Sequence, residues 1–230
     1  MLAQEVNLPS NYENGSNLNV IYRNDISGNF YLHSRGIGLT FHQGKHITNS
    51  SRSFYEIDFR TLNHPKQVKL TGAAQDRKRF VYGKLNSVML IGASLGMQKV
   101  IFTKADSKAV EVRFSYCFGP LIALAKPYYF QVDKKADLKF DDENFTPSKD
   151  LIVGRAPYSK GLNEIKIYPG ANAKFNFSFE YAPYTNLIRA VETGISLDYF
   201  PKALPIMAKN PAENFVLTVR VGFIFGMKWY

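Results

Sequence analysis

Residues 174–181 read KFNFSFEY, and their alternation of polar and aromatic side chains decides the class of fold. Successive side chains of a β-strand point to opposite faces of the sheet. One face of this segment therefore carries Phe175, Phe177, Phe179 and Tyr181, and the other carries Lys174, Asn176, Ser178 and Glu180. The segment predicts a strand with one apolar face and one charged face.

Four more segments repeat this plan. Their second faces include Glu56, Asp58 and Arg60 in 54–60, Glu111 and Arg113 in 110–118, Glu192 and Asp198 in 191–199, and Arg220 and Lys228 in 215–228. A soluble sandwich or lipocalin-like barrel also alternates, but its polar face meets bulk water. Here the polar faces mix glycine, serine and both charge signs, and the apolar faces are almost unbroken. This pattern favours a transmembrane β-barrel, while the soluble barrel or sandwich stays open as the alternative.

The composition bounds the class of protein. The 230 residues suffice for one domain, and 14% are aromatic, which suits strands. No apolar run reaches the roughly 18 residues of a transmembrane helix. The net charge of +10 is spread along the chain rather than gathered in one run, so we expect no nucleic-acid partner. Cys117 is the single cysteine, which excludes an internal disulfide.

The spacing of the alternating segments predicts an all-β fold, an eight-stranded antiparallel transmembrane β-barrel with long extracellular loops. We expect strands at about 18–24, 28–43, 52–63, 83–101, 108–130, 164–182, 186–200 and 213–230. The connections 44–51, 102–107 and 183–185 are short, 64–82, 131–163 and 201–212 are longer, and 25–27 is a turn. Short turns on one side and long loops on the other are typical of outer-membrane barrels.

The predicted barrel also implies a division of the chain into two parts and a location in the outer membrane. We expect residues 1–17 to form an N-terminal periplasmic segment and residues 18–230 to form the barrel domain. Residues 1–4 are too short for a signal peptide, so an outer-membrane location implies a signal that was removed or is absent from this chain. Pro120 and Pro169 are expected to interrupt two adjacent strands and to mark the outer edge of the membrane.

The cost of exposing charge to lipid orients the strands. An Arg or Lys facing lipid at the bilayer midplane costs about 2–4 kcal/mol, against a total fold stability of about 5–15 kcal/mol. The residues expected to point into the lumen are Glu56, Asp58, Arg60, Glu111, Arg113, Lys174, Glu180, Glu192, Asp198, Arg220 and Lys228. Side chains fill an eight-stranded lumen, so we expect paired charges that act as a plug. A proton path or a small-solute channel is the alternative.

No residue pattern indicates catalysis. His33 and Ser34 are sequence neighbours and would face opposite sides of a strand. His42, His46 and His64 are expected near strand ends or in loops, at the surface. Neither a metal-ligand spacing nor a nucleophile motif is present. We therefore expect no catalytic residue, cofactor or metal site. An enzyme that modifies outer-membrane lipid is the rival class, and it would need a nucleophile and a base within hydrogen-bond reach.

Two of the long loops are candidates for binding. Residues 66–79 carry Lys66, Lys69, Arg77, Lys78 and Arg79, which either contact lipopolysaccharide phosphates or an acidic partner, or are simply solvated. Residues 131–163 intersperse Phe140, Phe145, Leu151, Ile152 and Tyr158 among charges. Such apolar groups argue against disorder, and we expect them to form an outward cap on 121–130 and 163–168. Another outer-membrane protein or a surface lipoprotein would dock there.

Several motifs resemble small outer-membrane β-barrel proteins of the OmpA- and PorT-like kind. They are VIYRND at 20–25, GKLNS at 83–87, KPYY at 126–129, GLNEIKIYPG at 161–170 and PKALPIM at 201–207. The resemblance covers roughly residues 18–230, and the segment 161–170 is its most specific part. It implies an outer-membrane barrel, an accessory subunit of a machine for protein insertion or export. It transfers no catalytic residue.

Overall fold

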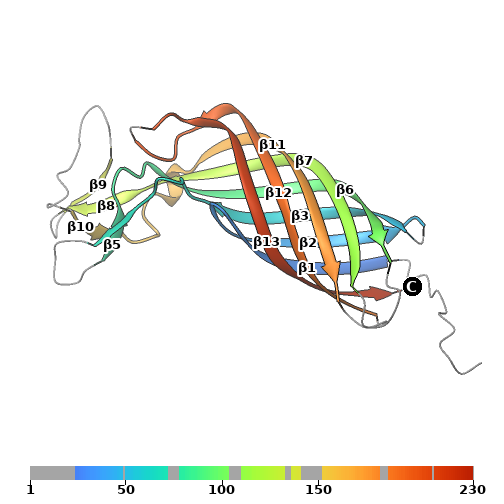
Figure 1. Ribbon diagram of the computed structural model, residues 1–230. Coiled ribbons are helices and arrows are strands. Elements are labelled where there is room, and N and C mark those ends of the chain that lie inside the picture. Colours follow the sequence, from blue (N-terminus) through green and yellow to red (C-terminus); the bar gives the residue numbers. More distant parts are fainter. Residues whose placement is uncertain are drawn as a thin grey trace, which may run out of the picture.

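The computed structural model describes residues 24–48, 50–71, 78–103, 110–132, 136–140, 152–181, 186–208 and 210–229. Eight of its strands form one closed antiparallel barrel (Figure 1). They are β1 (Asn24–His33), β2 (Gly36–His46), β3 (Ser51–Leu62), β6 (Asn86–Phe102), β7 (Glu111–Pro127), β11 (Lys166–Glu180), β12 (Leu187–Leu204) and β13 (Glu213–Trp229). Neighbours in the chain pair with each other, and β1 pairs with β13 to close the ring. The expected eight-stranded antiparallel barrel is confirmed.

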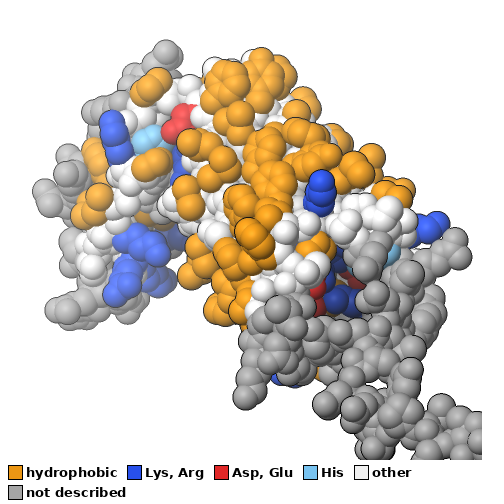
Figure 2. Space-filling view, turned by 45° about the vertical axis from the view of Figure 1, so that its right-hand side comes forward, with side chains coloured by type: hydrophobic (Ala, Val, Ile, Leu, Met, Phe, Trp, Pro, Cys, Tyr) orange, Lys and Arg blue, Asp and Glu red, His pale blue; other side chains and the backbone are white. Residues whose placement is uncertain are grey.

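The two faces of the barrel wall differ sharply in polarity. Every strand has large apolar side chains exposed on the outside, among them Phe30, Phe41, Ile57, Leu95, Phe118, Phe177, Leu197 and Phe223. Hydrophobic side chains form a broad band across the face of the barrel that is shown in Figure 2. The residues between them point inward, and many are charged. This arrangement is the reverse of a soluble protein and is what the hydrocarbon core of a bilayer requires. The soluble sandwich is thereby excluded.

The position of the first hairpin differs from the one that the sequence predicts. The expected strand 28–43 is two strands, because the chain turns at Ser34 and Arg35. The expected turn at 25–27 is part of β1, and most of the expected strand 18–24 lies outside the described residues. A Cβ at Gly36 would lie 2.5 Å from the carbonyl oxygen of Thr61, so only glycine allows β2 to begin so close to β3.

The two prolines do not interrupt their strands. Pro169 faces Ile122 and Pro120 faces Ala171 in an unbroken register that joins β7 to β11. The expectation of an interruption is therefore wrong. These two positions lack an amide donor, but the ladder between β7 and β11 continues through them. The pairing of β7 with β6, by contrast, skips Gly119 and Pro120. The wall formed by β6, β7 and β11 consequently extends as far as Pro127 and Lys166.

Two small sheets project from one end of the barrel, and together they form the cap. One pairs β4 (Lys69–Thr71) with β5 (Arg79–Val81), and the other has the order β10 (Ile152–Arg155), β8 (Tyr129–Val132), β9 (Ala136–Lys139). Figure 1 shows them beyond the mouth of the barrel, on the side opposite the C-terminus. A short 3-10 turn, η3 (Leu162–Glu164), leads back into β11. No helix in the described ranges is long and apolar enough to span a membrane.

The cap has an apolar core of its own. The core contains Phe80, Tyr128, Phe130, Phe140, Ile152 and Ala208, with Leu70, Tyr82, Leu85 and Val132 packed against it. Hydrogen bonds tie this unit to the barrel: Tyr128 N donates to Leu85 O at 2.9 Å, and Leu85 N donates to Ile206 O at 3.0 Å. The expected contribution of Phe140 and Ile152 is present, Tyr158 is exposed, and Phe145 and Leu151 lie outside the described residues.

Candidate functional site

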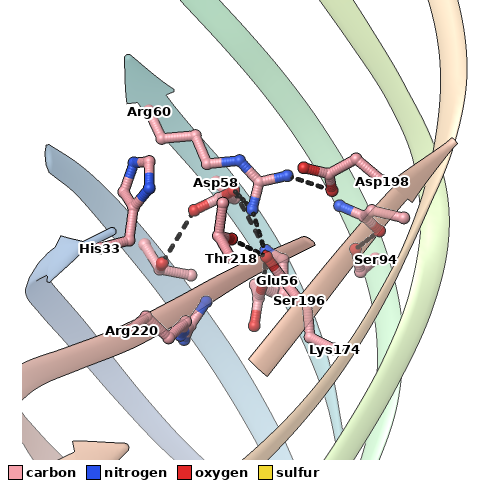
Figure 3. Close-up of polar contacts among 12 residues, drawn as sticks. His33, Glu56, Asp58, Arg60, Ser94, Lys174, Ser196, Asp198, Thr218 and Arg220 are labelled. Carbon is pink, nitrogen blue, oxygen red and sulfur yellow. Dashed lines mark hydrogen bonds and ion pairs between the residues drawn. The ribbon is translucent and has the colours of Figure 1, made fainter. Parts of the chain in front are cut away.

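A network of buried charges occupies the middle of the lumen (Figure 3). Lys174 of β11 pairs with the carboxylate of Glu56 on β3 and lies 3.1 Å from Oδ2 of Asp58 on the same strand. The imidazole Nε2 of His42 lies 2.8 Å from Oε2 of Glu56. Lys174 therefore bridges two carboxylates from the facing strand, and all four groups are shielded from solvent.

Arg60 extends the network across the lumen to β12. Its Nη1 lies 3.4 Å from Oδ2 of Asp58, and its Nη2 donates to Oδ1 of Asp198 at 2.5 Å. The hydroxyl of Tyr31 donates to Oδ1 of Asp58 at 2.5 Å. Three strands that are not all neighbours are thus connected through one guanidinium and one carboxylate. Such pairing offsets the cost of taking these charges out of water.

Arg220 of β13 forms a second cluster beside the first. Its guanidinium pairs with Glu192, and its central carbon lies 4.5 Å from the centroid of the Tyr31 ring. The amide Nδ2 of Asn29 donates to Oε1 of Glu192 at 2.8 Å. Arg220 is 1% exposed and Glu192 is 3% exposed, so the pair is sealed inside the wall.

A third cluster lies toward the barrel end opposite the cap. Arg113 Nε lies 2.5 Å from Oε1 of Glu111, and Arg113 Nη2 lies 2.6 Å from Oε2 of Glu180. Lys228 Nζ donates to Oε1 of Glu180 at 3.0 Å. The structure thus brings all eleven charges of the sequence-predicted set into the lumen, in three ion-paired groups.

Apolar side chains close the lumen above these charges, at the cap end. The group comprises Leu62, Val88, Leu90, Leu121, Ala123, Ala125, Tyr168, Phe200, Leu204, Ile206 and Val216, drawn from six strands and the segment after β12. A smaller group, Ile188, Ala190 and Ile224, lies toward the other end. Packed apolar side chains therefore occupy the lumen near the cap.

His42, His46 and His64 were expected at the surface, but none of them is exposed, so that expectation is wrong. His33 and His42 are buried and face the lumen, His64 is buried at the barrel mouth, and His46 is partly buried. His64 Nε2 lies 3.5 Å from Oε1 of Glu213. The sequence could have placed His42 on the lumen face, because Gly38, Thr40 and Gly44 alternate with apolar residues around it. Within the described ranges, no group of three His, Cys, Asp or Glu side chains is placed to hold a metal.

Sequence reasoning also missed one lumen pair. Asp25 and Arg52 form a buried ion pair close to the third cluster, and His46 Nε2 lies 3.7 Å from Oδ1 of Asp25. Asp25 was assigned to a turn because the first strand was placed too early. The alternation of Ile26, Phe30 and Leu32 with polar residues would have put Asp25 on the inner face.

The structure describes only part of the predicted basic loop at 66–79. Lys66 and Lys78 are exposed, and Arg77 lies outside the described residues. Lys69 and Arg79 lie at opposite ends of the β4–β5 ladder, where Lys69 faces Val81 and Arg79 faces Thr71. Both line a cleft at the base of the cap together with Lys84 and Arg155. The latter two were not singled out from the sequence. They become neighbours of the basic loop only because β10 packs beside β5, where a Cβ at Gly154 would lie 2.5 Å from Cβ of Lys78.

Several solved structures of outer-membrane proteins are similar to this chain at a low level. The closed eight-stranded barrel is established by the strand pairing of this protein itself. Neisserial surface protein A is 10% identical with a TM-score of 0.45 over 90% of this chain and 96% of that one. The N-terminal β-barrel domain of Pseudomonas aeruginosa OprF is 8% identical with a TM-score of 0.40, over 90% and 98%.

A third solved structure is similar at the same level. Ail, the attachment invasion locus protein of Yersinia pestis, crystallised with the heparin analogue sucrose octasulfate, is 6% identical with a TM-score of 0.41. The match covers 90% of this chain and 97% of that one. No protein-family model matches the chain, and no curated protein matches its sequence. The role of each side chain therefore rests on its own geometry.

Proposed function

We propose that the protein is a non-enzymatic outer-membrane β-barrel that serves as an accessory subunit of an outer-membrane complex and docks its partner through the cap. The observation that carries this proposal is a folded cap, with its own apolar core, fixed to a barrel whose interior is filled. A barrel that conducted solute would need an open lumen. A barrel that only anchored itself would not need a second core outside the membrane.

The outer surface of the cap has the character of a contact surface. Leu138, Tyr158 and Leu162 are exposed there, at 36%, 62% and 46%. Around them, Lys139 pairs with Glu164, and Lys160 Nζ lies 2.7 Å from Oδ2 of Asp137. Apolar side chains within a rim of charges are typical of surfaces that bind proteins. We assign the surface to another outer-membrane protein or a surface lipoprotein, held against it by the shared membrane.

Local contacts hold this surface in a fixed shape. The Tyr129 hydroxyl donates to Oε1 of Glu164 at 2.6 Å, which fastens the 3-10 turn to β8. Glu164 accepts a hydrogen bond from Lys139 and thereby raises the pKa of that ammonium. A surface ordered before binding loses little conformational entropy when the partner arrives.

Affinity purification in mild detergent tests the proposal. The tagged wild type should retain a specific set of outer-membrane proteins, and a variant with residues 132–160 replaced by a short Gly-Ser linker should lose them. The double variant Leu138→Ser and Tyr158→Ser should lose the same proteins, since it alters the surface and spares the apolar core of the cap. A wild type that purifies alone, or a cap deletion that keeps every partner, contradicts the proposal.

Mass spectrometry of lipids from a strain that lacks the protein tests the rival enzyme class. We expect lipid A and phospholipids to be unchanged, and an altered acyl pattern would indicate an enzyme instead.

A further inference from the structure

A cleft of about 340 Å³ lies where the cap meets the mouth of the barrel. Its walls come from three places: the residues after β3, the β4–β5 pair, and the residues at the start of β6, between β7 and β8, and at the end of β10. The lining residues are Asn63, Gln67, Lys69, Arg79, Phe80, Val81, Lys84, Ser87, Tyr128 and Arg155. Binding sites for small molecules usually measure about 300–1,000 Å³, so this cleft has room for one small ligand.

The charge of the cleft is entirely positive among these lining residues. Lys69, Lys84, Arg79 and Arg155 contribute four cations, and no Asp or Glu is among the described residues that line the cleft. None of the ion pairs found among the described residues involves any of the four. The lumen of the same protein shows the contrast, because each buried cation there faces a carboxylate. Like charges gathered without a counter-ion repel each other, and an anion relieves that repulsion.

Lys84 is held in the wall of the cleft. It is 6% exposed, and its Nζ donates to Oε1 of Gln67 at 3.0 Å and to Oδ1 of Asn63 at 3.3 Å. Two amide oxygens thus fix the ammonium, and a third N–H remains for a ligand. Burial, followed by the charges of Arg155 and Lys69, lowers the pKa of Lys84 to about 8. A bound anion would reverse the last two effects and favour the protonated form.

The remaining walls suit a sugar attached to the anion. Lys84 Nζ and the guanidinium of Arg155 lie 5.8 Å and 5.7 Å from the centroid of the Tyr128 ring, so aromatic and cationic groups share one wall. Phe80 adds a second aromatic side chain. Asn63, Gln67 and Ser87 supply donors and acceptors for hydroxyl groups. This combination of cations, amides and aromatic faces matches a phosphorylated sugar better than a bare inorganic ion.

We propose that this cleft binds a phosphorylated sugar, with Lys84 and Arg155 holding the phosphate and the amide side chains of Asn63 and Gln67 contacting sugar hydroxyls. The cleft lies beyond the apolar band, at the cap end, where the headgroup of a glycolipid would meet the protein as readily as a soluble phosphosugar. The proposal does not depend on which protein docks on the cap, because the cleft is at the base of the cap and the docking surface is on its outside.

Titration calorimetry of the detergent-solubilised full chain with glucose 1-phosphate tests the proposal. We expect saturable binding, weaker binding of inorganic phosphate and none of glucose. Lys84→Gln and Arg155→Gln should each weaken binding about tenfold or more, since each removes a charge-assisted hydrogen bond. Lys160→Gln removes a cap charge outside the cleft and should change the affinity less than about twofold. Heat-modifiable migration on gels verifies that every variant is folded.

The pH dependence of the affinity distinguishes direct binding by Lys84 from a purely structural role, which would not change it. Raising the pH from 7 to 9 deprotonates Lys84 in the free protein, so the affinity of the wild type should fall about fivefold to tenfold. The affinity of Lys84→Gln should change far less over the same range. A pH profile that is identical in the two proteins would overturn the assignment of the phosphate to Lys84.

A second arm separates the two sources of the phosphosugar. Phosphatidylcholine vesicles containing lipid A are compared with vesicles containing dephosphorylated lipid A, again with wild type and the two cleft variants. Preference for phosphorylated lipid A that is lost in both variants supports a lipid headgroup as the natural ligand. Binding of glucose 1-phosphate alone, with the same loss, supports a soluble one. No binding of either probe, or equal binding by the cleft variants, overturns the proposal.

Discussion

At the scale of a single residue, Arg220 has its guanidinium enclosed in the barrel and paired with Glu192. Removing one partner of a buried pair leaves the other charge without compensation, which typically costs about 3–5 kcal/mol. We therefore expect Arg220→Ala to lower the free energy of unfolding by about that amount. Urea unfolding of the barrel in lipid vesicles measures the change. Lys160→Ala, at an exposed ion pair of the cap, is the control and should cost less than about 1 kcal/mol.

A second variant that also replaces Glu192, the partner of Arg220, tests whether the ion pair itself explains the loss of stability. The double variant Arg220→Met and Glu192→Leu removes both charges and keeps most of the volume, so it should recover most of the stability lost by Arg220→Ala. A double variant as unstable as the single one would show that Arg220 stabilises the barrel through other contacts, such as its position over the Tyr31 ring.

At the scale of one element, β13 tests which face of the wall meets lipid. Val221 lies near the middle of the strand with its side chain outward, and Met227 is outward near the end. An Arg at the bilayer midplane costs about 2–4 kcal/mol, and one near the interface costs about 0–1 kcal/mol. Val221→Arg should therefore destabilise the barrel by more than Met227→Arg, measured by unfolding in vesicles. Equal costs would argue against a bilayer centred on this part of the strand.

At the scale of the whole molecule, the filled lumen predicts the electrical behaviour. The three ion-paired clusters and the apolar group at the cap end leave side chains where a pore would hold water. Purified protein in planar bilayers should show no steady large conductance. Removing the cap should not create one, because the groups that fill the lumen belong to the barrel strands and, for Ile206, to the segment just after β12. Stable channel openings in the wild type would refute the plug.

The sequence determined the class of fold and the orientation of the strands. Charge beside lipid is so costly that Glu56, Asp58 and Arg60 could take only one side of β3. The sequence-based prediction misplaced the first hairpin, although the outward apolar residues change there from even numbers, Phe30 and Leu32 in β1, to odd numbers, Ile37 and Leu39 in β2. A parity change within one apparent strand indicates a turn or a bulge, because the period of a strand is two. Strand β6 does not show the alternation of polar and apolar residues along its first part, because Val88 and Leu90 face an apolar part of the lumen.

The tertiary structure alone decided which charges meet. Alternation tells which face a side chain takes, but the height at which strands pair decides its partner. Lys174 lies 118 positions from Glu56, and Arg60 lies 138 positions from Asp198. The same holds for the cleft: Lys69, Lys84 and Arg155 become neighbours only when β10 packs against the β4–β5 pair. Local sequence determines which side chains lie on each face of a barrel. Closure of the ring and packing of the cap bring distant side chains together. Those contacts depend on strand register and on loops that have no periodic pattern, so the sequence alone does not predict them.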